Sequence, residues 1–216
     1  MFIFSSQQLL ANTLKITPTL SFYSTKLVGE DESAGTDGKL ISNLNTLSGL
    51  TMSYAFSQSF HLFLSYLTGS VQFDNTQDVI NGDEGYTRTK MSAGIRYIAF
   101  SIVAFRFLYN IDKEIGFEID STNKAVLKDE SINYLSAYYD QIVYMGGMIN
   151  AGFYIGHELS SSSDSFSNKS ASEYGLFTFI DNLKLSYYLR NVSKESDNLV
   201  FTQNDSIFEL NYTFSF

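Results

Sequence analysis

Histidine, serine and acidic residues are the candidates for nucleophilic chemistry in this sequence. The stretch "GHELSSSSDS" sets His157 beside Glu158 and a run of serines, and Glu173 follows it. A histidine that removes a proton from a serine hydroxyl, oriented by a carboxylate, would turn that serine into a nucleophile. A rim enzyme built on His157 is therefore one hypothesis. The alternative is a histidine beside a polar surface loop, because the order and spacing of these residues match no known motif.

Two acidic segments could attract divalent cations. They are "GEDES" at residues 29–33 and "NGDEG" at residues 81–85. Carboxylate oxygens are the ligands that Ca²⁺ and Mg²⁺ prefer, but "DNTQDVINGDEG" does not have the spacing of a calcium-binding loop. The chain also contains no cysteine, which excludes a thiolate nucleophile or a cysteine-type zinc site. We expect no metal site, no cofactor and solvated acidic loops.

Basic side chains form the most informative pattern. In "RTKMSAGIRY" they alternate with apolar or small residues, so that one face of a strand would be basic and the other apolar. The bases outside the predicted loops also include Lys15 and Lys26. If these strands cross a lipid bilayer, each base turned toward lipid would cost about 2 to 4 kcal/mol near the midplane. We therefore predict a charge cluster inside a barrel, made of Arg88, Lys90, Arg96, Arg106, Lys184, Arg190 and Glu209.

Alternation with a period of two runs along the whole chain and predicts an all-β protein. The composition agrees, because 19 Phe and 15 Tyr among 216 residues favour strands over helices. No apolar run approaches the length of a membrane-spanning helix. The net charge is -9 and there is no basic tract, so we expect no nucleic-acid partner.

The connections between the predicted strands alternate in length. Short turns are predicted at residues 57–59, near Phe100, near Asp140 and at residues 181–182. Long loops are predicted at residues 28–43, 74–85, 112–130, 160–172 and 191–205, and these hold 18 of the 23 acidic residues. This asymmetry indicates an antiparallel up-and-down transmembrane β-barrel of about 10 strands, with 8 or 12 possible. A soluble sandwich or lipocalin-like barrel is the alternative.

The barrel is predicted to be a single domain over residues 13–216. Residues 1–12, "MFIFSSQQLLAN", are predicted to be a residual export signal or a mobile tail, because an apolar patch precedes Ala11 without a basic region.

The end of the chain resembles the assembly signal of bacterial outer-membrane β-barrel proteins. That class ends in a strand of alternating hydrophobic residues with a terminal aromatic residue, and the matching residues here are Phe208, Leu210, Tyr212, Phe214 and Phe216. The resemblance implies a location in the bacterial outer membrane, contact with outer-membrane lipid and lipopolysaccharide, and recognition by the barrel-assembly machinery. It names no specific family and no surface ligand.

Three functions follow as expectations. The first is a non-enzymatic structural or surface-interaction role with long acidic extracellular loops. The second is a narrow, anion-leaning, porin-like channel, since rings of Arg and Lys favour anions, although a ten-stranded barrel leaves little lumen. The third is a rim enzyme that resembles lipid A deacylases; omptin-type proteases also have ten strands. His61 and His157 are predicted at opposite ends, where they cannot share a site.

Overall fold

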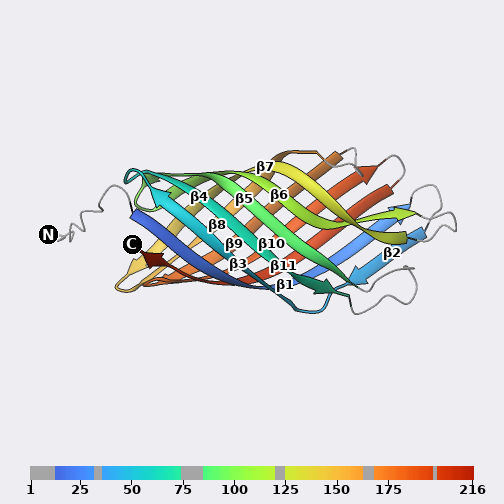
Figure 1. Cartoon of the computed structure of the whole chain (residues 1–216), viewed down its shortest axis with the longest axis horizontal. Helices are drawn as coiled ribbons and strands as arrows, with labels where there is room; N and C mark the ends of the chain where they lie inside the picture. Colours follow the sequence, from blue (N-terminus) through green and yellow to red (C-terminus); the bar gives the residue numbers. More distant parts are fainter. Residues whose placement is uncertain (1–12, 32–35, 74–84, 120–124, 163–167, 197–198) are drawn as a thin grey trace.

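The chain folds into a single closed β-barrel, shown in Figure 1. The structure is a computed structural model that describes residues 13–31, 36–73, 85–119, 125–162, 168–196 and 199–216. Residues 1–12 and most of "NGDEG" lie outside this range, so the predictions for them stay predictions. The strands are β1 (Thr13–Asp31), β2 (Thr36–Ile41), β3 (Asn45–Ala55), β4 (Phe60–Gln72), β5 (Gly85–Phe100), β6 (Val103–Ile119), β7 (Ala125–Gly146), β8 (Ile149–Ser162), β9 (Asn168–Ile180), β10 (Leu183–Ser196), β11 (Leu199–Tyr212) and β12 (Phe214–Ser215).

Ten of these strands form the barrel, which confirms the predicted fold and strand number. From β3 to β11 each strand pairs antiparallel with the next in sequence, and β1 pairs with β3 on one side and with β11 on the other. The closing register joins Thr19 to Asn211 and Phe22 to Phe208. The short strands β2 and β12 both run alongside β1. Both ends of the described chain lie at the end of the barrel that carries the short turns (Figure 1).

Two of the short turns use a backbone conformation with positive φ. Gly147 has φ 57° between β7 and β8, and Asp181 has φ 52° between β9 and β10. Two-residue connections of this kind match the twist of the strands they join. The turn predicted near Asp140 is wrong, because β7 continues to Gly146. Asp140 is instead an inward-facing strand residue that binds Arg106.

Most of the predicted long loops are also wrong. β6 extends to Ile119 and β7 begins at Ala125. β8 extends to Ser162 and β9 begins at Asn168. Only residues 197–198 lie between β10 and β11. A strand needs about 9 to 11 residues to cross a bilayer, whereas β7 has 22. The strands therefore continue well past the length of one crossing. Residues 74–84 lie outside the described part of the chain.

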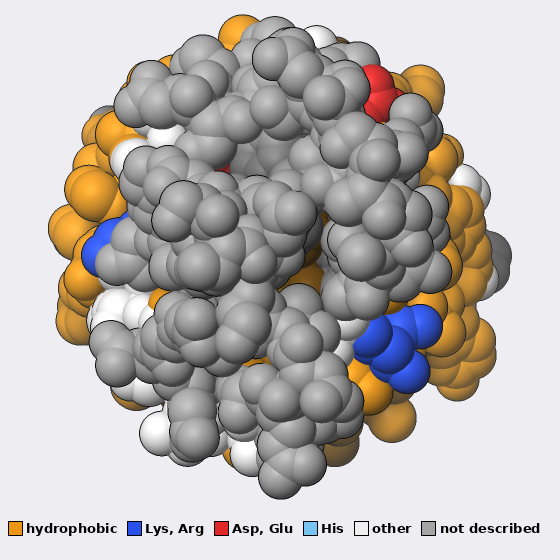
Figure 2. Space-filling view, turned by 90° about the vertical axis from the view of Figure 1, so that its right-hand side faces the viewer, with side chains coloured by type: hydrophobic (Ala, Val, Ile, Leu, Met, Phe, Trp, Pro, Cys, Tyr) orange, Lys and Arg blue, Asp and Glu red, His pale blue; other side chains and the backbone are white. Residues whose placement is uncertain are grey.

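The exterior of the barrel carries an apolar belt. Leu64, for example, is 62% exposed and Leu176 is 66% exposed, which would be costly on a surface in water. Hydrophobic side chains are visible along both flanks in Figure 2, which looks onto the loop-side end. Other belt members are Leu20, Leu50, Met52, Leu62, Met91, Ile95, Phe107, Leu135, Ile155, Tyr187 and Phe208. No helix among the described residues is long and apolar enough to span a membrane.

Alternation assigns the interior face as well. On β1, Ser21, Tyr23, Thr25 and Leu27 are buried, while Lys26 between them is exposed. The prediction that Lys26 faces the lumen is therefore wrong, since it follows the even-numbered residues of β1 to the outside. An apolar cluster fills the loop-side lumen next to β1, β3 and β4: Tyr23, Leu27, Leu40, Leu47, Val71, Phe73, Tyr86, Phe201 and Ile207.

Candidate functional site: the barrel lumen

The loop-side half of the lumen holds a buried network of charges. Its bases are Arg88, Lys169, Arg190 and Lys194, and its acids are Asp112, Glu114, Glu130, Glu158 and Asp205. These side chains come from β5 to β11, so the network reaches across the lumen from many directions. Their exposed side-chain fractions range from 0% to 6%.

Arg190 on β10 is the centre of the network. Its Nη2 atom donates hydrogen bonds to Glu114 of β6 and to Glu158 of β8, the latter at 2.8 Å. Its Nη1 atom donates to Asp205 of β11 at 3.2 Å. The planar guanidinium group, with five donors, suits this branched contact because its donors point in several directions at once. A single side chain thus ties together three strands other than its own.

Arg88 on β5 extends the network toward β1. Its Nη2 atom donates to Asp112 at 3.2 Å, and its Nη1 atom lies 3.5 Å from Asp205. The guanidinium also stacks over the ring of Tyr23, with its carbon 4.7 Å from the ring centre. The Tyr23 hydroxyl donates to Asp205 at 2.8 Å, and the Gln203 amide donates to the same carboxylate at 2.9 Å. Asp205 therefore accepts from strands on both sides of the barrel closure.

Two lysines complete the network near its loop-side edge. Lys169 Nζ lies 3.0 Å from Glu158, and Lys194 Nζ lies 3.2 Å from Glu114 and 3.4 Å from Glu130. Charges this deeply buried need partners, since an unpaired buried ion costs several kcal/mol. Together with the apolar cluster beside β1, β3 and β4, the charges fill the loop-side lumen with side chains.

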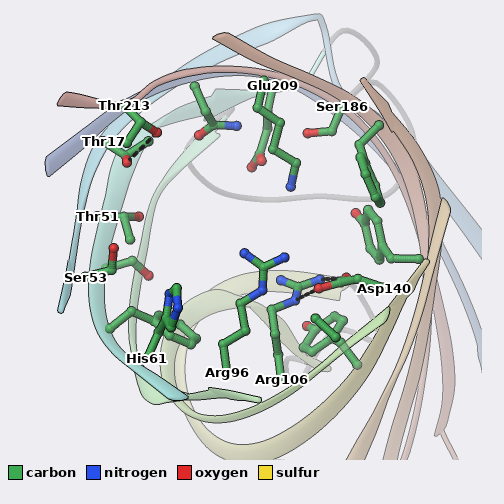
Figure 3. A pocket seen from close by; sticks show the side chains of 18 of the residues that line it. Thr17, Thr51, Ser53, His61, Arg96, Arg106, Asp140, Ser186, Glu209 and Thr213 are labelled. Carbon is green, nitrogen blue, oxygen red and sulfur yellow. Dashed lines mark hydrogen bonds and ion pairs between the residues drawn. The ribbon is translucent and has the colours of Figure 1, made fainter. Parts of the chain in front are cut away.

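The short-turn half of the lumen is hollow. A cavity of about 460 Å³ is lined by inward-facing residues from all ten barrel strands. It reaches the turn between β5 and β6, where Ser101 and Ile102 are exposed. Figure 3 shows its walls, with Thr17, Thr51 and Ser53 on one side and Arg96 and Arg106 pointing into the open centre.

Arg96 and Arg106 stand directly opposite each other on β5 and β6. Arg106 binds Asp140 through two hydrogen bonds of 2.8 Å, one from Nε and one from Nη2, and it stacks over Tyr138 with its carbon 4.5 Å from the ring centre. The buried Nε of Arg96 has no hydrogen-bond partner among the described residues. Asp140 also attracts Arg96 electrostatically, but its two hydrogen bonds among the described residues come from Arg106.

Three further predicted residues line the same cavity. Lys184 Nζ lies 5.3 Å from the ring centre of Phe177. The carboxylate of Glu209 accepts a hydrogen bond of 2.8 Å from the Tyr188 hydroxyl. Lys90 lies between the two halves of the lumen, where its Nζ is 5.7 Å from the ring centre of Tyr134.

The predicted charge cluster thus divides between two places. Arg88 and Arg190 belong to the loop-side network, whereas Lys90, Arg96, Arg106, Lys184 and Glu209 line the cavity. Sequence reasoning missed the acidic half of the network, because Asp112, Glu114, Glu130 and Asp205 were assigned to loops and Glu158 to a rim site. Their spacing could have predicted an inward position. Residues 112 and 114 follow Asn110 at intervals of two, so they lie on the same face of β6 as Asn110, which faces the lumen.

Among the described side chains, no Ser-His-acid set forms around His157; those of the serine run at residues 160–165 are not among them. The His157 side chain is exposed on the outer face of β8, and its Nδ1 lies 3.1 Å from the Ser172 hydroxyl on β9. Glu158 and Glu173 both face the lumen instead. Because neighbouring strand residues point to opposite faces, His157 and Glu158 are separated by the barrel wall. His61 lines the cavity near the short turns, so the two histidines lie at opposite ends as predicted.

Comparisons with known proteins show similarity in fold. No protein-family model matches the chain, and no curated protein matches its sequence. Among solved structures, the outer membrane protease OmpT from Escherichia coli superposes with a TM-score of 0.51 at 8% identity, covering 96% of this chain and 98% of that one. The β domain of the Bordetella autotransporter BrkA gives 0.45 at 10% identity, covering 91% and 98%. The attachment protein Ail of Yersinia pestis gives 0.36 at 12% identity, covering 92% and 98%.

The exterior belt and the fold lead to the same conclusion about location. A closed barrel leaves no unpaired strand edge in lipid, and its exposed apolar belt needs a hydrocarbon surrounding. The chain has the fold of bacterial outer-membrane β-barrel proteins, and its apolar belt suits a lipid bilayer.

Proposed function

We propose that this protein is a non-enzymatic outer-membrane barrel with a structural or surface-interaction role, whose lumen is closed to solutes. The observation that carries the proposal is the buried network around Arg190, which joins Glu114, Glu158 and Asp205 across the loop-side lumen. Buried ion pairs of this kind hold the strands in one arrangement and leave little room for a water-filled path. A rigid, closed barrel is suited to present its extended strands outside the membrane.

The position of His157 supports a non-enzymatic role. Its side chain lies on the outer face, apart from the inward-facing Glu158 and Glu173. OmpT, which shares the fold, is a protease by its name, but similarity at 8% identity carries only the fold. Mass spectrometry of lipid A from cells with and without the protein tests this part: unchanged acylation is expected, and loss of an acyl chain that depends on His157 would contradict it.

Lipid and lipopolysaccharide are the partners that the exterior fits best. The belt contacts hydrocarbon, and beyond it on the loop side stand two exposed bases, Lys26 on β1 and Lys39 on β2. Their strands are paired, with Lys26 opposite Ile41 and Val28 opposite Lys39. Two neighbouring cations just beyond the loop-side edge of the belt suit the phosphates of outer-leaflet lipid. The acidic residues in "GEDES" lie partly outside the described range.

A narrow anion-leaning channel is the second candidate. The cavity favours it, because its lining includes five bases, Lys15, Lys90, Arg96, Arg106 and Lys184, against three acids, Asp140, Glu173 and Glu209. Conductance in planar lipid bilayers separates the two functions. The closed barrel predicts no stable ohmic steps from the purified protein. Regular anion-selective steps that change with Arg106→Ala would replace the proposal with the channel.

A further inference from the structure

We propose that the short-turn cavity is a binding site for a small organic oxyanion that carries hydroxyl groups, such as a sugar phosphate. The cavity has about 460 Å³, which is within the range of small-molecule sites. It reaches the exposed turn residues Ser101 and Ile102, so a ligand can enter from that end without crossing the loop-side network. Binding at this site therefore does not depend on whether the barrel conducts solutes.

Two neighbouring arginines with an unbalanced charge lie on the cavity wall. Arg96 and Arg106 are direct cross-strand partners, and like charges in that position repel each other. Asp140 is engaged by two hydrogen bonds from Arg106. The buried Nε of Arg96 lacks a partner among the described residues, and Figure 3 shows its side chain directed into the open centre beside Arg106. An oxyanion between the two guanidinium groups would add a second negative charge to that of Asp140 and would accept a hydrogen bond from Arg96 Nε.

The third cation of the site comes from β10. Lys184 lines the same cavity, close enough to Arg96 and Arg106 to be repelled by both and close enough to Asp140 and Glu209 to be attracted by them. The nearby Glu209 is already hydrogen-bonded by Tyr188. Asp140 is hydrogen-bonded by Arg106 and Glu209 by Tyr188, and the lining as a whole holds five bases against three acids, which leaves a net positive charge.

The other walls indicate the rest of the ligand. Thr51 and Ser53 of β3, with Thr17 of β1, place hydroxyl groups on the wall beside the arginines in Figure 3. Hydroxyl groups both donate and accept hydrogen bonds, so they suit the hydroxyls of a polyol or sugar. Phe177 and Tyr154 form an apolar wall from β9 and β8. The combination favours a hydroxylated organic anion over a bare inorganic one.

Isothermal titration calorimetry on the whole chain, folded in detergent, tests the proposal. The probes are glucose 6-phosphate, inorganic phosphate and glucose. We expect glucose 6-phosphate to bind most tightly, phosphate more weakly and glucose not measurably. Arg96→Gln should weaken glucose 6-phosphate about tenfold to a hundredfold, because hydrogen bonds to charged groups contribute about 1.5 to 3 kcal/mol. Lys113→Gln removes a positive charge from the outer face of β6, away from the cavity, and should leave glucose 6-phosphate binding unchanged.

Three outcomes would overturn the proposal. They are the absence of binding by both anions to the wild-type protein, equal binding of glucose and glucose 6-phosphate, and an Arg96→Gln protein that binds as the wild type does. A shift in electrophoretic mobility on heating, which is characteristic of folded barrels, shows that each variant is folded. If Arg96→Gln does not fold, the order of affinity of the three probes for the wild-type protein decides, because it needs no substitution.

Discussion

Arg190 joins three carboxylates from three other strands inside the loop-side lumen. It donates to Glu114, Glu158 and Asp205, and the carboxylates it engages are themselves shared with Lys169, Lys194 and Arg88. Such a network couples its members, so that removing one base leaves several acids short of a partner. The cost of a change at this position is therefore set by the buried acids that remain.

Replacing Arg190 by methionine should destabilise the barrel by about 3 to 5 kcal/mol, the range found when one partner of a buried ion pair is removed. Urea titration of the protein in detergent micelles, followed by circular dichroism, measures this change. Lys39→Met is the matched control: this exposed base on β2 should change stability by no more than about 0.5 kcal/mol. Equal stability of the Arg190→Met and wild-type proteins would show that the network does not hold the barrel together.

Each strand of the barrel has two faces with different requirements, and the sequence shows this most clearly within the belt. On β9, Tyr174 and Leu176 face outward, while Glu173, Gly175 and Phe177 face the lumen. The same alternation predicted the faces of β5 and β6 from the positions of their bases. The alternation was least informative in the loop-side parts of the strands. There the outer face is also polar, so the sequence pattern resembles that of a loop.

Leu176→Arg should therefore cost about 2 to 4 kcal/mol, because Leu176 lies in the middle of the β9 belt and its replacement would place a charge in lipid. Ser172→Arg on the same face of the same strand, beyond Tyr174, should cost about 0 to 1 kcal/mol, as expected near the interface. Folding titrations into lipid vesicles compare the two variants directly. Similar costs at both positions would contradict the placement of the belt.

The last strand offers a test of assembly. Phe208, Tyr212, Phe214 and Phe216 are exposed on the exterior, and β11 and β12 pair with β1 to close the barrel. We propose that this alternating face is also recognised by the barrel-assembly machinery. Phe216→Ala should lower the amount of folded protein in the outer membrane severalfold in cells, yet leave unassisted refolding in detergent nearly unchanged. A parallel loss in both assays would indicate a structural role alone.

The wrong predictions for the acidic residues share one physical cause. Asp140 has the residue type of a turn, and Asp112, Glu114 and Glu130 have the residue type of a solvated loop. Each is instead held inside a strand by a base on another strand, such as Arg106 for Asp140 or Lys194 for Glu130. Pairings between residues far apart in sequence leave no local pattern, so the partners of these acids were not predictable, although parity with Asn110 could have placed Asp112 and Glu114 in the lumen.

At the scale of the whole molecule, the lumen has two compartments. The loop-side half is filled by ion pairs and an apolar cluster, and the short-turn half holds the basic cavity. In this class of barrel the short turns face the periplasm. With this orientation the filled half would lie toward the outside and the cavity toward the periplasm, as the proposed scaffold and the proposed anion site both require.

The reactivity of single cysteines in the folded protein tests this division most directly, because the natural chain contains none. Thr19 and Thr25 lie on the same inner face of β1: Thr19 lines the cavity, whereas Thr25 is 2% exposed in the filled half. A small water-soluble maleimide should label Thr19→Cys rapidly in detergent, and should label Thr25→Cys only after the barrel is unfolded. Labelling of Thr25→Cys at the rate of Thr19→Cys, with both proteins folded, would contradict a closed loop-side lumen.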